Sequence, residues 1–250
     1  MIYSDCHCHL ETYGPEQLAQ VLEQAREKHV DIIVSMGSNL ESSAETVRLA
    51  QAYEGVLAAV GIHPWWPVPP TDEIWTRLHE LTRRERVVAI GEIGLDYVQN
   101  PQTKELQKEV FIFQLSLARE TGLPVNIHCR EAHQDMMNIL RKEMASDLRG
   151  IIHGFSGDMT TLKDWLDLGF YVSIGVRGFI IDEIASLPAV IRELPSDRLL
   201  IETDSLAFIE QSRGPVDVLS VVHKLASIRG ATIEDIANTT TANLKRLLKL

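Results

Sequence analysis

The feature that most constrains the fold of this chain is a regular alternation of short apolar runs with longer amphipathic segments. The apolar runs, which predict β-strands, lie at 1–4, 31–36, 56–61, 87–91, 124–128, 150–153, 170–174 and 198–202. Between them, apolar residues recur at helical spacing in segments 15–29, 41–53, 72–85, 102–121, 132–145, 159–168 and 181–193. Parallel strands that are buried on both faces are nearly all apolar, and helical crossovers join them. The pattern therefore predicts an α/β fold, a single (β/α)8 (TIM) barrel.

The rest of the chain fits one barrel domain spanning residues 1–250. Segments 215–229 and 232–250 predict extra C-terminal helices, with no further strand. A length of 250 residues is common for a barrel of this kind. The alternative is an open doubly wound sheet, but no Gly-x-Gly-x-x-Gly turn follows the first apolar run.

Charge and hydropathy limit the partners of the chain. The net charge of −11 provides no broad basic field for nucleic acid, so any site for a polyanion has to be local. We expect no membrane span and no secretory leader, and hence a cytoplasmic protein, because no apolar run is long enough. The three cysteines, Cys6, Cys8 and Cys129, form no Cys-x-x-Cys pair and are expected to be reduced.

Side chains that bind metals occur at the ends of the predicted strands. Seven such side chains lie at or just after the ends of predicted strands: His7, His9, His63, Glu92, His128, His153 and Asp204. The C-terminal ends of the strands form one face of a barrel, where the active site lies. So many imidazoles and carboxylates without a cation would be costly to bury, which predicts a metal centre. The remaining histidines are expected on the surface: His29, His79, His133 and His223.

The first of these strands presents a dense set of such groups, Asp5-Cys6-His7-Cys8-His9. Side chains alternate between the two faces of a strand, so Asp5, His7 and His9 are expected on one face and the two cysteines on the other. This arrangement places Cys6 and Cys8 outside the site. We expect Asp5 to support the site and not to be a primary ligand.

Six of the strand-end residues are candidate metal ligands: His7, His9, Glu92, His128, His153 and Asp204. A single catalytic zinc takes fewer protein ligands than this. Six ligands suit two divalent ions that share a bridging carboxylate, and Glu92 lies midway between the two sets of histidines. Two ions about 4 Å apart can clamp the attacking and leaving oxygens of a displacement and generate hydroxide at neutral pH. The pattern therefore indicates a hydrolase. Zinc, magnesium, manganese and nickel all remain possible, because such ligands accept each of them.

Six ordered segments resemble the TatD family of metal-dependent hydrolases, within the amidohydrolase-like superfamily. They are DCHCHL (5–10), GIHP (61–64), GEIGLDY (91–97), LPVNIHCREA (123–132), HGFSG (153–157) and IETDS (201–205). The resemblance implies that His7, His9, Glu92 and Asp204 hold one metal. It implies that Glu92, His128 and His153 hold the other, and that Asp204 is also the base that activates water. It further implies metal-dependent hydrolysis of DNA phosphodiester bonds, as a 3′ to 5′ exonuclease.

Three positions near these ligands have two interpretations each. Arg130 follows His128 on the same face and suits a substrate phosphate, or it pairs with Glu131 or Asp96. His63 contacts substrate or assists proton transfer, or it packs against the proline that follows it. The two tryptophans at 65 and 66 either stack on a base at the rim of the barrel or cap the barrel, and we favour the cap.

The loop after Asp204 departs from the family. The family has a proline and an aromatic residue after the last Asp-Ser, whereas this chain continues with LAF at 206–208 and SRGP at 212–215. The choice of substrate is therefore open. We expect DNA or another phosphodiester, held weakly, and favour a monomer. The alternatives are a small-molecule amidohydrolase or phosphoesterase with the same two-metal site, and a metal-binding protein without catalysis.

Overall fold

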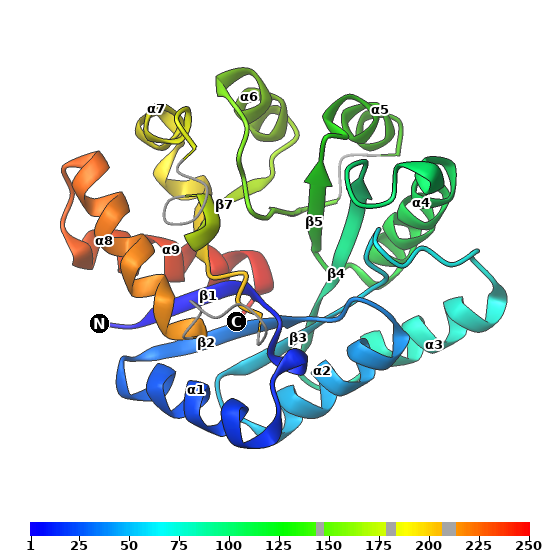
Figure 1. Ribbon diagram of the computed structural model, residues 1–250, viewed down its shortest axis with the longest axis horizontal. Helices are drawn as coiled ribbons and strands as arrows, with labels where there is room; N and C mark the ends of the chain where they lie inside the picture. The colour runs from blue at the N-terminus through cyan, green and yellow to red at the C-terminus, as the bar shows by residue number, and fades with distance from the viewer. Residues whose placement is uncertain (144–147, 179–183, 207–213) are drawn as a thin grey trace. The chain divides into compact units, whose positions relative to one another are not determined.

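The computed structural model describes residues 1–143, 148–178, 184–206 and 214–250. Its eight strands follow one another in chain order in a single sheet (Figure 1). The chain forms two compact units, residues 1–35 with 153–250, and residues 36–152.

The first unit contains the first and the last strands of the chain. Its strands are β1 (Tyr3–Cys8), β2 (Val30–Met36), β7 (Tyr171–Gly175) and β8 (Leu199–Glu202). β1 pairs in parallel with β2, and β7 with β8. The backbone N–H of Asp204 donates to the carbonyl of His7 (2.9 Å), and that of His9 donates to the carbonyl of Ser205 (3.0 Å). The last strand is thus a neighbour of the first, which gives the sheet the closed topology of the predicted (β/α)8 barrel.

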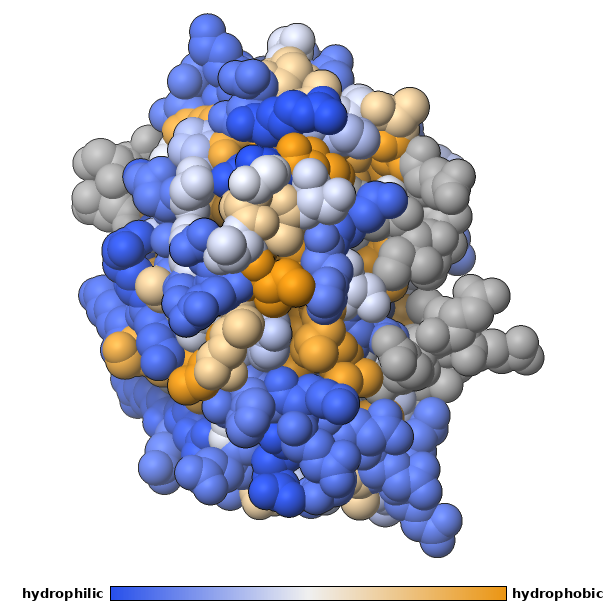
Figure 2. Space-filling model, turned by 90° about the vertical axis from the view of Figure 1, so that its left-hand side faces the viewer, coloured by the Kyte–Doolittle hydropathy of each residue, from blue (hydrophilic) through white to orange (hydrophobic). Residues whose placement is uncertain are grey.

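The helices of the first unit are amphipathic and cover these strands. They are α1 (Pro15–Glu27), α6 (Met159–Asp167), α7 (Leu187–Glu193), α8 (Val218–Arg229) and α9 (Ile233–Leu248), with short 3₁₀ turns η1 (Leu10–Thr12), η4 (Ser196–Arg198) and η5 (Gly214–Asp217). The extra C-terminal helices predicted from the sequence are α8 and α9, and α9 packs against β1 and β8 (Figure 1). The face beside α8 is mostly hydrophilic with a narrow band of hydrophobic residues (Figure 2), as expected of helices whose apolar side faces the strands.

The second unit consists of four consecutive parallel strands with their crossover helices. The elements are α2 (Leu40–Ala52), β3 (Val56–Val60), α3 (Asp72–Thr82), β4 (Val87–Asp96), η2 (Pro101–Thr103), α4 (Lys104–Thr121), β5 (Val125–Arg130), α5 (His133–Glu143) and β6 (Gly150–Ile152). β4 pairs with β3 and with β5, and β5 pairs with β6.

Two buried glutamines of α4 fix the ends of β3 and β4. The side chain of Gln114 accepts from the N–H of Ile62 (2.7 Å) and donates to its carbonyl (3.0 Å). Gln107 makes the same pair of hydrogen bonds with the backbone of Asp96, at 2.8 and 2.9 Å. Both glutamines are buried, so their amides replace water at the backbone of Asp96, the last residue of β4, and of Ile62, just after β3. The next residue after Ile62, His63, is thereby held in place.

The main difference from the predicted elements is the length of β4. The apolar run predicts a strand that ends at residue 91, but β4 continues to Asp96, because residues 93–96 pair with residues 127–130 of β5. Glu92 therefore lies inside β4 and not after it. The helix predicted at 181–193 is observed as α7 at Leu187–Glu193, and residues 179–183 lie outside the described parts. Within the described residues, no helix combines the length and apolar character that crossing a membrane requires.

Candidate metal centre

The first unit brings together two histidines of β1 and its C-terminal end with the aspartate that follows β8. The Nε2 atoms of His7 and His9 both lie 3.6 Å from Oδ1 of Asp204. This separation is too long for a hydrogen bond. It is close to the distance of about 3.4 Å between two ligand atoms on one tetrahedral zinc. The three residues offer ligand atoms within 4.8 Å of one another, so their arrangement fits a bound cation.

His153, which directly follows β6 in the sequence, adds a third imidazole to this cluster. Its ring stacks on that of His7, with centroids 3.8 Å apart and planes inclined by 10°. Its Nδ1 lies 3.5 Å from Oε1 of Glu202. The structure thus brings together four of the six predicted ligands in the first unit: His7, His9, His153 and Asp204.

Asp204 has a backbone conformation that supports a functional role. Its φ of 49° lies in the left-handed region, which residues other than glycine seldom adopt, and aspartate tolerates it better than most. Its side chain remains 24% exposed, whereas that of His7 is buried. A strained residue that points a partly exposed carboxylate at two buried imidazoles is typical of an active site.

β1 does not follow simple alternation near its ligands. Asp5 pairs with Ile33 and Cys8 with Ser35, so β1 has one more residue than β2 in this interval, a bulge that contains Cys6 and His7. The Sγ of Cys6 lies 3.1 Å from Oγ of Ser173 and 3.9 Å from Oε2 of Glu202. Glu202 is therefore a neighbour of both Cys6 and His153. Cys6 thus lies nearer to the histidines than the alternation of side chains along a strand predicts. Burial raises the pKa of the Cys6 thiol, so it stays neutral.

Asp5 supports the end of β8. Its carboxylate accepts hydrogen bonds from the hydroxyl and the N–H of Thr203 and from the N–H of His7. Burial raises the pKa of Asp5 well above its usual value, although these hydrogen bonds oppose the rise. No metal-ligand group within the described residues includes Asp5.

The second unit contains a cluster of candidate ligands around Glu92. Oε1 of this buried glutamate lies 2.8 Å from Nδ1 of His128 and 3.1 Å from Nε2 of His63. The N–H of Trp65 donates to Nδ1 of His63 (3.0 Å), so a neutral His63 ring carries its proton on Nε2 and donates it to Glu92. The three residues also offer ligand atoms within 4.8 Å of one another. His63 thus belongs to the buried cluster and not to the open rim.

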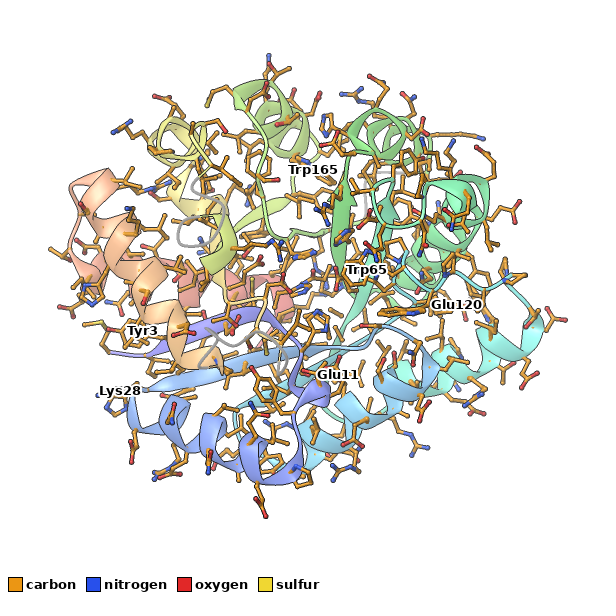
Figure 3. The ribbon with its side chains drawn as sticks, in the orientation of Figure 1. Tyr3, Glu11, Lys28, Trp65, Glu120 and Trp165 are labelled. Atoms are coloured by element: carbon orange, nitrogen blue, oxygen red, sulfur yellow. The ribbon has the colours of Figure 1, made fainter. Side chains whose placement is uncertain are left out.

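Asp96, which the sequence interpretation treated only as a possible partner of Arg130, completes this cluster. Its Oδ2 lies 3.1 Å from Nε2 of His128 and accepts a 2.6 Å hydrogen bond from the indole of Trp65, which lies beside β4 in Figure 3. Burial favours the neutral form of Asp96, but hydrogen bonds from His128, the backbone of residues 98–99 and the indole hold its pKa far below the usual value. The spacing of Glu92 and Asp96 along one strand could have indicated that Asp96 belongs to the site. The sequence prediction missed it because it ended this strand at residue 91.

Glu11 and Glu202 are further carboxylates that the sequence interpretation missed. Glu11 lies in η1 and is labelled in Figure 3. Its Oε1 lies 3.1 Å from Nδ1 of His9. Glu202, the last residue of β8, accepts from the N–H of Gly154 (2.6 Å) and lies near His153. Burial opposes the charge of Glu202, but His153 and His7 lower its pKa below the usual value. A carboxylate on the second ring nitrogen is typical of histidines that ligate metals.

The remaining predicted residues join no ligand group in the described parts. Arg130 ends β5 and is exposed, and the described residues provide no hydrogen bond or ion pair to its guanidinium, including the proposed pairs with Glu131 and Asp96. Four histidines predicted on the surface are exposed or half-buried and join no ligand group in the described parts: His29, His79, His133 and His223. Of the divergent loop after Asp204, residues 207–213 lie outside the described residues.

Comparison with known proteins places the chain in a family. The family model for TatD related DNase matches residues 4–249. The uncharacterized metal-dependent hydrolase YabD of Bacillus subtilis is 37% identical over 254 residues, which cover 98% of each chain. The 3′-5′ ssDNA/RNA exonuclease TatD of Pectobacterium atrosepticum is 31% identical over 243 residues, 92% of this chain and 93% of that protein.

A solved structure agrees with these matches. The TatD homolog YJJV of Escherichia coli K12 superposes with a TM-score of 0.87 at 27% identity, over 99% of this chain and 98% of that one. The whole fold is therefore shared, and in this chain it carries His, Glu and Asp groups that fit metal ions. The chain belongs to the TatD-related DNase family and is a metal-dependent hydrolase.

Proposed function

We propose that this hydrolase cleaves phosphodiester bonds in DNA, as a TatD-type exonuclease that uses two divalent cations. The observation that carries the proposal is the convergence of His7 Nε2 and His9 Nε2 on one oxygen of Asp204, each at 3.6 Å. Three donors at cation spacing, one of them a partly exposed carboxylate, fit the donor set of a catalytic metal site, which keeps a position open for water. The 3′-5′ ssDNA/RNA exonuclease named above supports the choice of bond.

The residues divide into two ligand sets. His7, His9 and Asp204 are assigned to one ion, and Glu92 and His128 to the other. The TatD resemblance further implies that Glu92 is shared between the ions and that His153 joins the second set, and both remain proposals. When bound, the ions supply Lewis acidity and an activated water at neutral pH. Their identity among zinc, magnesium, manganese and nickel is open, because these ligands accept all four.

Several side chains of this chain have further roles in the proposal. Asp204 accepts the proton of the attacking water, since its carboxylate is partly exposed. His63 donates to Glu92 and keeps that carboxylate oriented, which makes it a positioning residue in addition to the predicted substrate contact. Arg130, exposed and without a partner among the described residues, binds a substrate phosphate. The free cysteines are typical of a reducing compartment, which supports the predicted cytoplasmic location.

The test compares matched variants on a labelled single-stranded oligonucleotide. The purified chain is stripped of metal with a chelator and reloaded separately with each of the four ions. Asp204→Asn is expected to lower kcat by about 10²–10⁴-fold, the range that removal of a general base produces. His223→Ala, on the exposed face of α8, is the control and is expected to keep full activity. Absence of DNA cleavage with every ion, although each ion binds, would overturn the proposal.

The second candidate is a hydrolase of small phosphoesters or amides with the same metal site. The observation that favours it is the net charge of −11, which disfavours a long DNA footprint. The two candidates differ in their preferred substrate. A larger kcat/KM for lactones, amides or bis(p-nitrophenyl) phosphate than for an oligonucleotide would favour the second candidate.

A further inference from the structure

The two tryptophans that follow His63 have different environments in the second unit. Trp65 is fixed: its indole donates to Asp96, its N–H donates to His63, and its carbonyl accepts from Asn100 (2.6 Å). These contacts agree with the interpretation of Trp65 as a cap. The backbone N–H of Trp66 also donates to the carbonyl of His63 (3.0 Å), yet its side chain is 53% exposed. Trp66 thus has a fixed backbone and an indole that faces water.

The exposed indole lies close to the Glu92 cluster. The ring centroid of Trp66 is 6.0 Å from that of His63 and 5.7 Å from that of Trp65, which supports it edge-on at 66°. His63 in turn lies 3.1 Å from Glu92. A single imidazole therefore separates the exposed aromatic face from the candidate metal ligands.

Packing does not account for the position of Trp66. Other aromatic rings of this unit are already covered. Trp75 stacks on His79 at an interplanar angle of 11°, and Tyr97 has the ammonium of Lys104 4.3 Å above its ring and a hydrogen bond to Asp135. An indole that leaves half of its surface in water beside a candidate metal cluster is available to a ligand that stacks on it.

The chemistry of this rim points to a nucleotide. An indole face binds flat aromatic rings by stacking, and it tolerates all four bases because each base has a π-face. Arg130 is the last residue of β5 and pairs with Asp96 of β4. Asp96 also accepts the hydrogen bond from the indole of Trp65. The exposed guanidinium at the end of β5 and the exposed indole in the segment after β3 suit the phosphate and the base of one ligand.

We propose that Trp66 is a stacking platform for an unpaired nucleobase of the substrate. The base lies on the indole while the adjoining phosphate lies at the Glu92 cluster within reach of Arg130. A base in a duplex is already stacked and paired, so the platform selects single-stranded ends. This assignment rests on the proposed nuclease function and adds to it the residue that holds the unpaired base; a single-stranded substrate is already named for the exonuclease relative.

The main experiment removes the base and the indole separately. One oligonucleotide has normal nucleotides throughout, and each of the others has an abasic nucleotide at one terminal position. Cleavage of each substrate is measured with the wild type, Trp66→Ala, Trp66→Phe and Val68→Ala. Val68 is exposed near Trp66 in the sequence and is not aromatic, so it is the matched control. Trp66→Ala is expected to raise KM about tenfold on the normal substrate, the effect of one lost stacking contact. kcat is expected to change less than about twofold, because stacking is equal in the ground and transition states.

The substrate with the abasic nucleotide at the stacked position provides the decisive comparison. The wild type and Trp66→Ala are expected to have the same KM on it, and Trp66→Phe is expected to restore most of the affinity for the normal substrate. An unchanged KM for Trp66→Ala on every normal substrate overturns the proposal. An equal loss on normal and abasic substrates overturns it as well, since the defect is then structural.

A binding measurement separates this inference from the proposed function. Calorimetry compares dTMP with deoxyribose 5-phosphate on the full chain. If no DNA is cleaved but dTMP binds better than the sugar phosphate and Trp66→Ala removes the difference, the nuclease proposal fails and the nucleobase site stands. If DNA is cleaved and Trp66→Ala changes neither KM nor dTMP binding, the nucleobase site fails alone.

Discussion

The carboxylates behind the imidazoles decide which ring nitrogen each histidine offers to a cation. Glu11 binds Nδ1 of His9 and leaves Nε2 toward Asp204. Asp96 binds Nε2 of His128, so Nδ1 is the atom that faces Glu92. Such partners fix the tautomer and the ring orientation and make the ligand more basic. The two histidines therefore present opposite nitrogens, a distinction that residue type alone cannot reveal.

At the residue scale, the first prediction concerns Glu11. Glu11→Ala is expected to weaken metal binding about 10–100-fold, because His9 loses the partner that holds its ring. Competition titration with a chromogenic chelator measures the affinity directly, without any assay of activity. Glu16→Ala, in the exposed first turn of α1, is the control and is expected to keep the wild-type affinity. An unchanged affinity in Glu11→Ala would show that η1 has no role in the site.

The second residue-scale prediction concerns the charge of Asp96. Its folded pKa lies below its usual value of 3.8, so the carboxylate stabilises the fold above that pH and the stabilisation is lost as the pH falls toward the folded pKa. Asp96→Asn is expected to lower the free energy of unfolding by about 2 kcal/mol at neutral pH, the value of a hydrogen bond to a charged group. Urea unfolding with chelator present measures the difference at several pH values. The difference between wild type and variant is expected to shrink below about pH 4; a constant difference would show that charge is not the cause.

At the scale of elements, β4 and β5 approach each other more closely than most residues allow. The φ of Gly94 is +146°, and a Cβ placed on it would lie 1.9 Å from the carbonyl oxygen of His128. One residue of β4 is extra between Ile90 and Ile93, a bulge that contains Glu92 and turns that side chain toward His128. The glycine and the bulge together place Glu92 against β5.

Gly94→Ala is the prediction that tests this close approach. The variant is expected to lose about 3 kcal/mol or more of unfolding free energy, from backbone strain and from the clash. Chemical denaturation followed by circular dichroism measures the loss. Gly14→Ala is the control, because a Cβ there meets nothing within 4 Å and the backbone is already extended. A variant as stable as the wild type would show that β4 can move away from β5 without cost.

The sequence predicted the elements well and the interior of the site only in part. Strand and helix periodicity located all eight strands, because each is a nearly unbroken apolar run between amphipathic segments. The prediction made β4 too short, because Glu92 and Asp96 interrupt the apolar run although both side chains are buried. Glu202 was missed for a related reason: it ends an apolar run and reads as a strand boundary, whereas its carboxylate faces His153. Polar residues inside a core depend on partners that are remote in the sequence, which periodicity does not encode.

At the scale of the whole molecule, charge limits how the enzyme can hold the polyanion that we propose as its substrate. The chain has 35 acidic and 24 basic residues, a net charge of −11. Binding of nucleic acid depends mainly on the number of phosphates that cationic side chains neutralise. In the described residues near the Glu92 cluster, Arg130 is the cation that we assign to a phosphate. The molecule is therefore expected to recognise an end of a strand through local contacts and not a long stretch of backbone.

This expectation predicts a weak dependence on salt. The slope of log(kcat/KM) against log of the salt concentration is expected to be about −0.7 to −1.4 for a single-stranded oligonucleotide, the value for one or two neutralised phosphates. Arg130→Gln is expected to make the slope shallower by about 0.7, because one contact is lost. His223→Ala tests for general effects of substitution, and a constant excess of the divalent ion keeps the metal site filled while the salt varies. A slope steeper than about −4 would mean that several more cations line the path of the strand, and an unchanged slope in Arg130→Gln would remove this arginine from the substrate site.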